Sequence, residues 1–255
     1  MAPKPAIVLI PGSFTTAAMY YPLQDILLAQ GYDVYINALP SATRNPPEPP
    51  ASLSDDASFF GNIIGTIADQ GKDIIVLGHS FGGMVACESA KGQGKAEREA
   101  RGQPGGIIRI IFLTAIVLPE GQSVTDHQGQ PPTSIIATDE HGFMRLTDPA
   151  FSASRVYDTW PEERALAWAK AAPKHSALSF ASPLTYAAYK DIPSSYIFCE
   201  QDQILPPPVQ EHYINNIKAA TGKEVDIHKL STNHAPNLTA TEDLVEVILK
   251  IAIAS

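Results

Sequence analysis

The sequence predicts an α/β fold in which a mostly parallel β-sheet is covered by helices on both faces. Strand-like apolar runs alternate with helical patterns along most of the 255 residues, an order typical of parallel sheets. The run 74–77 holds four consecutive apolar residues, three of them β-branched, as expected of a strand buried on both faces. It leads without a gap into a glycine-rich turn at 78–82 and then into a helical stretch of small residues. This strand, turn and helix are therefore expected at the centre of the fold.

The composition fits one large domain, with 44% hydrophobic residues and a formal net charge of −9. Because no basic stripe is present, we expect neither a nucleic acid nor a membrane surface as a partner. The two cysteines, Cys87 and Cys199, lie in apolar stretches and are expected in the core rather than in a disulfide. No secretion signal or membrane-spanning apolar run is recognised, so we expect a cytoplasmic protein. The sequence leaves open whether it forms a homodimer.

Each element in the first half of the chain has its own signal. Strands are expected at 6–10, 34–36, 74–77 and 107–113. A helix is expected from about Tyr20 to Gly31, where the glycine would form a C-terminal cap. A second helix is expected to begin at Ser54 and to end at Gly71, with acidic residues in its first turn. The charged, glycine-rich segment 91–106 reads as a solvated connection.

The character of the sequence changes over residues 119–192. Strand-like runs disappear there, and prolines, polar residues and aromatic residues mix. We interpret this segment as a mainly helical cap, or lid, inserted into one compact core made of 1–118 and 193–255. Helices are expected from Pro161 and over 181–190. After the insertion, strands are expected at 195–199 and 224–230, and helices over 210–220 and after a capping box that starts at Thr239.

The turn Gly78-His79-Ser80-Phe81-Gly82 fits the pattern G-x-S-x-G, which presents a serine between a strand and a helix. Glycines suit the two outer positions because larger side chains would collide with the adjacent strand and helix. The following helix points the unpaired N–H groups of its first turn toward the serine hydroxyl. Although the five-residue pattern is weak alone, the buried strand before it and the small-residue helix after it favour a nucleophile over an incidental turn serine.

A serine hydroxyl is a poor nucleophile unless a base accepts its proton, and histidine oriented by a carboxylate is suited to this. Ser80, Asp202 and His234 follow the chain order serine, acid, histidine. Each comes just after an expected strand, at the sheet edge where open α/β folds bind ligands. Two rival acids are less favoured: Glu200 directly follows the expected strand and is still in its register, and Asp226 lies in the middle of a strand.

No cluster of cysteines and histidines has metal-ligand spacing, and no phosphate-binding loop is found, so we expect no metal and no cofactor. His79 is expected to be structural, because its side chain should point away from the serine. Three histidines of the insertion either contact the substrate or, as we favour, are exposed, namely His127, His141 and His175.

A tetrahedral intermediate also needs backbone N–H donors. The N–H of Phe81 is the first candidate, and that of Ser13, in the loop with Gly12 and Phe14, is the second. Aromatic residues of the insertion either line the substrate pocket or form the core of the insertion, namely Tyr157, Trp160, Trp168 and Phe180.

Four stretches carry a resemblance to a known superfamily: Ile7–Phe14, Gly78–Gly82, Tyr196–Asp202 and Asn233–Asn237. Nearly the whole chain resembles the α/β-hydrolases, in the esterase and hydroxynitrile lyase branch that includes plant methyl-salicylate esterases. The resemblance implies a cofactor-free acyl-enzyme mechanism under a mostly helical cap. Two departures stand out. Pro11 replaces a histidine that is usual in the family, and Ala235 replaces a lysine of the lyase members, which argues against cyanohydrin cleavage.

These observations favour a serine hydrolase that cleaves a small, largely apolar ester or lactone. Two alternatives stay open at this point. One is a lyase or a carbon–carbon bond-cleaving enzyme that uses the same three residues. The other is a small-molecule receptor that keeps a vestigial triad and turns its ligand over negligibly.

Overall fold

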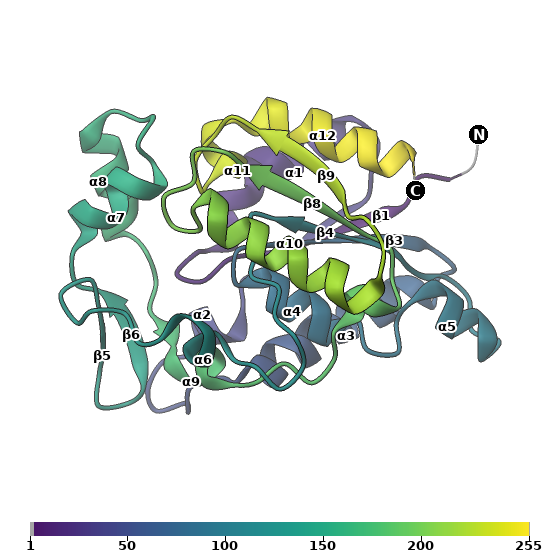
Figure 1. The fold of residues 1–255 in the computed structure, drawn as a ribbon, viewed down its shortest axis with the longest axis horizontal. Coiled ribbons are helices and arrows are strands. Elements are labelled where there is room, and N and C mark those ends of the chain that lie inside the picture. The colour runs from purple at the N-terminus through teal and green to yellow at the C-terminus, as the bar shows by residue number, and fades with distance from the viewer. Residues whose placement is uncertain (1–2, 255) are drawn as a thin grey trace.

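The computed structural model describes residues 3–254, and its centre is a six-stranded parallel sheet in the order β2-β1-β3-β4-β8-β9 (Figure 1). The expected parallel α/β class is thereby confirmed. The strands are β1 Ala6–Ile10, β2 Val34–Ile36, β3 Asp73–His79, β4 Gly106–Leu113, β8 Ser194–Cys199 and β9 Asp226–Leu230.

Helices cover both faces of this sheet (Figure 1). Both faces need this cover because both are apolar. Along β1, the side chains of Ile7 and Leu9 pack under one helical layer, whereas that of Val8 packs under the other. The first layer holds α1 Tyr21–Ala29 and α12 Thr241–Ile253. The second holds α3 Leu53–Ala68, α4 Gly82–Ser89 and α10 Pro207–Thr221. None of the helices in residues 3–254 has the length and apolar character needed to cross a membrane.

Short helices connect these elements: η1 Ala17–Tyr20, α2 Pro40–Thr43, α5 Lys95–Ala100 and α11 Pro236–Thr239. The presence of α5 corrects the interpretation of 91–106 as only a solvated connection. Arg98 of this helix is buried, with an exposed fraction of 3%, and its guanidinium lies 2.6 Å from Asp69. This ion pair holds the segment against the end of α3.

Two expected helix starts are also corrected. The helix α3 begins one residue before Ser54, because Ser52 forms a capping box with Asp55. The capping box expected at Thr239 is wrong, since α12 follows Ala240 and has no side-chain cap. The Thr239 hydroxyl donates instead to the side-chain oxygen of Asn233, at 2.8 Å.

Residues 119–192 lie between β4 and β8 and contain both helices and strands. The helices are α6 Val124–Gln128, α7 Pro149–Val156, α8 Glu162–Lys170, α9 Ala177–Ala181 and η2 Ala188–Lys190. A small antiparallel sheet, which was not expected, is formed by β5 Ile136–Thr138, β6 Phe143–Leu146 and β7 His175–Ser176. These strands are too short to show an alternating pattern. The helix expected over 181–190 is wrong, because α9 ends just before Ser182-Pro183 and proline disfavours helix in the residue before it.

The turn between β3 and α4 has a strained backbone that its glycines permit. Ser80 has a φ of 54°, in the left-handed region that side chains rarely adopt. A Cβ at Gly78 would lie 2.5 Å from the carbonyl oxygen of Gly82, and a Cβ at Gly82 would lie 2.5 Å from that of Ile10. The chain therefore needs glycine on both sides of Ser80 for steric reasons.

We predict that Gly82→Ala destabilises the fold, because the backbone of β1 would have to move away from the added methyl group. Overpacking of this kind costs roughly 1–3 kcal/mol of unfolding free energy. The matched control is Gly61→Ala in α3, where the new Cβ would meet its nearest atom at 3.5 Å. We expect the control to be neutral or stabilising by up to about 1 kcal/mol. Urea unfolding would measure both, and equal effects would contradict the steric argument.

Candidate active site

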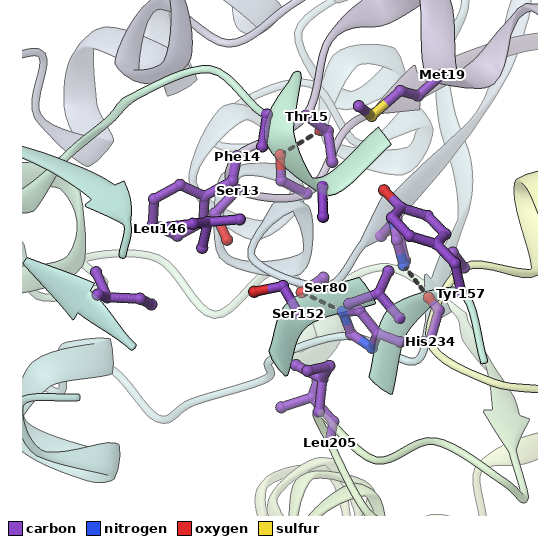
Figure 2. A pocket seen from close by; sticks show the side chains of 18 of the residues that line it. Ser13, Phe14, Thr15, Met19, Ser80, Leu146, Ser152, Tyr157, Leu205 and His234 are labelled. Atoms are coloured by element: carbon purple, nitrogen blue, oxygen red, sulfur yellow. Dashed lines mark hydrogen bonds between the residues drawn. The ribbon is translucent and has the colours of Figure 1, made fainter. Parts of the chain in front are cut away.

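Three side chains meet at the carboxyl edge of the sheet. The Ser80 hydroxyl oxygen lies 3.0 Å from Nε2 of His234, and Nδ1 of His234 lies 2.6 Å from a carboxylate oxygen of Asp202. Ser80 follows β3, Asp202 follows β8 and His234 follows β9, so parallel strands bring together residues that are up to 154 positions apart. The structure thus assembles the three residues predicted from sequence, and Figure 2 shows the contact between Ser80 and His234.

The Asp202 carboxylate is fully engaged by hydrogen bonds. One oxygen accepts from the backbone N–H groups of Ile204 and Leu205, at 2.7 and 2.9 Å. The other accepts from the Thr114 hydroxyl and faces His234. Burial alone would raise the pKa of Asp202, but the electrostatic interaction with His234 and these hydrogen bonds lower the pKa below its ordinary value. Asp202 is therefore an ionised group that fixes the orientation of the His234 ring.

Neither rival acid reaches His234. Asp226 accepts a hydrogen bond from Ser195 at 2.7 Å and faces His228 at 3.1 Å. Glu200 faces Lys229 at 3.9 Å. Both are thus excluded as partners of His234 on geometric grounds.

Two backbone N–H groups beside Ser80 are available to a ligand. Within residues 3–254, neither the N–H of Ser13 nor that of Phe81 donates to another protein group. A Cβ on Gly12 would lie 3.1 Å from Cβ of Ser80, so the 12–14 loop runs directly against the serine. Phe14 has a φ of 56°, which marks the same loop as strained. The N–H groups of Ser13 and Phe81 could therefore donate hydrogen bonds to an anion that forms on a group bound at Ser80.

Ser80 and His234 open into a cavity of about 220 Å³. Figure 2 shows side chains of the 13–15 loop, of the 119–192 insertion and of Leu205 around them. Many of the lining residues are apolar, including Met19, Ile116, Ile136, Leu146, Val156, Leu205 and Leu238. In the described part of the chain, no Asp, Glu, Lys or Arg lines the cavity. Sequence reasoning missed these apolar wall residues, because their spacing is indistinguishable from that of core residues.

The aromatic residues of the insertion divide into two groups. Tyr157 and Phe180 line the cavity, which agrees with the interpretation of these aromatic residues as pocket residues. Trp160 follows the other interpretation, the core of the insertion: its ring stacks on Tyr157 at 5.3 Å and meets Trp168 edge-on at 5.4 Å. Both tryptophans belong to the apolar cluster between α7 and α8. They hold these helices together and do not reach the cavity.

The other histidines are largely accounted for by their packing. His79 is buried between Tyr20 and the backbone of His234, and burial lowers its pKa to about 3. His175 was expected to be exposed but is fully buried among Phe14, Phe81 and Phe180, and burial likewise lowers its pKa to about 3. The sequence could not reveal this, because His175 lies on the unexpected strand β7.

His127 stacks on His212, with ring centroids 4.9 Å apart, so it too is packed rather than free. His141 is the histidine of the insertion that is exposed as expected. Among residues 3–254, no group of three His, Cys, Asp or Glu side chains is arranged to hold a metal ion.

Comparison with known proteins places the chain in a family. Residues 7–247 match the sequence profile described as the alpha/beta hydrolase family. A probable hydrolase R7 of Phoma sp. is 33% identical over 252 residues, which cover 98% of each chain. Polyneuridine aldehyde esterase of Rauvolfia serpentina is 22% identical over 268 residues, covering 96% of this chain and 94% of that protein.

A solved structure shares the fold at lower identity. A pyrethroid hydrolase of Sphingobium faniae superposes with a TM-score of 0.74 at 21% identity, covering 98% of both chains. The family match over most of the chain agrees with the strand–turn–helix around Ser80 and with the order of the strands. This chain is therefore a member of the alpha/beta hydrolase family, as its motifs indicated.

Proposed function

We propose that the chain is a serine hydrolase that cleaves a small, uncharged and mainly apolar ester or lactone through an acyl-enzyme intermediate. The observation that carries this proposal is the line of hydrogen bonds from Asp202 through His234 to Ser80, at the wall of an apolar cavity. A serine in that position has a base within reach, and the base has an ionised acid that orients it.

The chemistry follows from the positions of these atoms. His234 Nε2 takes the hydroxyl proton as Ser80 Oγ forms a bond to the carbonyl carbon, and the N–H groups of Phe81 and Ser13 donate to the resulting oxyanion. His234 then gives the proton to the leaving alkoxide oxygen as the carbon–oxygen bond breaks. In the second half, His234 removes a proton from water as the water oxygen attacks the acyl carbon. His234 then gives that proton to Ser80 Oγ as the bond between Oγ and the acyl carbon breaks, which releases the acid and restores Ser80. For a lactone, the alcohol and acid leave as one molecule.

The cavity supports the substrate class. A volume of about 220 Å³ fits a small acyl or alkyl group, and the walls offer no charged partner for an ionised one. The name of the Rauvolfia relative, an esterase, agrees with this class. We also assign the 119–192 insertion the role of a cap, since Leu146, Ser152 and Tyr157 come from it and face Ser80 across the cavity (Figure 2).

The two alternatives have less support. Ala235 is buried beside His234 in the cavity wall and supplies no positive charge for a cyanide leaving group. A receptor would not need a base at hydrogen-bond distance from Ser80. Here Nε2 of His234 lies 3.0 Å from the Ser80 hydroxyl oxygen. Turnover of β-diketones or cyanohydrins without turnover of esters would replace the ester assignment with a lyase or carbon–carbon cleavage.

We predict that a fluorophosphonate forms one adduct with the wild-type protein and none with Ser80→Ala. The reason is that only a serine whose proton is accepted by a neighbouring base reacts readily with this phosphorus centre. Intact-mass spectrometry after incubation measures the adduct. A folded, monodisperse wild-type protein that gains no mass would argue against an activated serine and for the receptor.

We predict that Asp202→Asn lowers kcat by roughly 10³ to 10⁴-fold, because an amide at this position would favour the wrong tautomer of His234. The matched control is Asp226→Asn, which alters the rival acid in the neighbouring part of the sheet. We expect the control to keep kcat within about twofold of wild type. Hydrolysis of p-nitrophenyl butyrate would measure both, and a larger loss in the control would reassign the acid.

We predict that an ester with an ionised acyl chain is a poor substrate. Moving a carboxylate into a cavity without a cation costs several kcal/mol, so kcat/KM should fall by about 100-fold or more. Comparing p-nitrophenyl hydrogen succinate with p-nitrophenyl butyrate at neutral pH tests this, because the two differ mainly in the terminal charge. Equal values of kcat/KM would show that the acyl group does not enter the apolar cavity.

A further inference from the structure

A chain of three buried hydrogen bonds joins the 12–14 loop to the backbone of His234 without passing through Ser80. The backbone N–H of Gly12 lies 2.9 Å from the Tyr20 hydroxyl, which lies 2.6 Å from Nδ1 of His79. Nε2 of His79 in turn lies 2.8 Å from the carbonyl oxygen of His234. The exposed fractions of Tyr20 and His79 are 0% and 3%, so water does not compete for these bonds.

The direction of every bond in this chain is fixed by its two ends. The Gly12 N–H can only donate, so the Tyr20 oxygen accepts there and its own proton goes to Nδ1 of His79. The His234 carbonyl can only accept, so His79 carries its proton on Nε2. A neutral imidazole supplies this combination of one acceptor and one donor. Burial lowers the pKa of His79 to about 3 and raises that of Tyr20, which keeps both groups in the required form.

Further contacts tie the same two regions together. The Thr15 hydroxyl donates to the carbonyl oxygen of Gly12 at 2.6 Å, which closes the loop on itself. The Asn237 amide donates to the carbonyl oxygen of Met19 at 2.9 Å, linking α11, just after His234, to η1, which carries Tyr20. The loop and the segment of His234 are thus held by one network centred on Tyr20 and His79.

We infer that Tyr20 and His79 are positioning residues. They hold the backbone N–H group of Ser13 and the ring of His234 at the places where both can act on a group bound at Ser80. This inference rests on the proposed serine hydrolase function. Both side chains border the cavity, but the hydroxyl of Tyr20 and the two ring nitrogens of His79 are occupied within the protein. They act on the reaction through the groups they hold rather than by touching the substrate.

The Tyr20→Phe variant separates positioning from packing. It keeps the aromatic wall but leaves the Gly12 N–H without an acceptor and His79 Nδ1 without a donor. Because displacements of about 1 Å can lower catalytic rates by 100-fold, we expect kcat to fall by roughly 10- to 100-fold. KM should stay within about twofold, since the apolar surface that binds the substrate is unchanged. Steady-state hydrolysis of p-nitrophenyl butyrate gives both constants.

The matched control is Tyr189→Phe, which also removes a buried hydroxyl. That hydroxyl donates to the carbonyl oxygen of Leu118 at 3.0 Å and takes no part in the network. We expect both variants to lose similar thermal stability, and only Tyr20→Phe to lose kcat. Equal loss of kcat in both, or unchanged kcat in Tyr20→Phe while the wild-type enzyme is active, would overturn the inference. A wild-type protein that neither hydrolyses esters nor reacts with fluorophosphonate would instead overturn the proposed function.

Two substitutions of His79 give a second test, and the comparison between them does not depend on Tyr20→Phe folding. His79→Gln keeps an amide donor for the His234 carbonyl oxygen, whereas His79→Leu keeps none. We expect His79→Gln to retain more kcat than His79→Leu. We also expect Tyr20→Phe to cause little further loss in the His79→Leu background, because the chain is already broken there. Losses that multiply would show that the two residues act separately. A glutamine variant no better than the leucine variant would show that the bond to the His234 carbonyl oxygen does not support the reaction. Either result would overturn the inference.

Discussion

The close approach of β1, β3 and α4 at Ser80 is the constraint on which the rest of the site depends. Gly78 and Gly82 let the backbones pass where a Cβ would lie 2.5 Å from a carbonyl oxygen. The left-handed φ of Ser80 then turns its hydroxyl out of the sheet and toward His234. Because the loop after β1 packs on the same turn, one steric arrangement positions both the serine and the backbone N–H groups beside it.

The second constraint on the site is burial. Polar groups buried at the sheet edge must each form a hydrogen bond, because an unpartnered buried group costs free energy. Asp202 meets this constraint with donors on both oxygens, which is why its pKa is lowered despite burial. His79 and Tyr20 meet it by bonding to each other and to two backbone groups. Polar groups satisfied in this way have little freedom to reorient, so the site is organised before a ligand arrives.

The parts that the sequence predicted are those with a local signal. The strand at 74–77, the turn at 78–82 and the three residues at strand ends follow from short patterns and from the rule that parallel strands end at one edge. The role of Tyr20 had no such signal, because its partner His79 lies 59 positions away. The insertion was the least predictable region: its strands are two to four residues long. Whether an aromatic residue such as Trp160 faces the cavity depends on packing between helices rather than on spacing.

The insertion is nevertheless not independent of the chemistry at the sheet edge. Asp158, which follows α7, accepts hydrogen bonds from Asn233 at 2.7 Å and from Gln203 at 3.0 Å. These two residues are the immediate neighbours of His234 and Asp202. The apolar cluster of α7 and α8 also contacts Ala235 and Leu238. The segment that forms one wall of the cavity is thus fastened to the loops that carry His234 and Asp202. Under the proposed function, changes in the insertion that alter substrate choice would therefore also alter the position of the groups that perform the reaction.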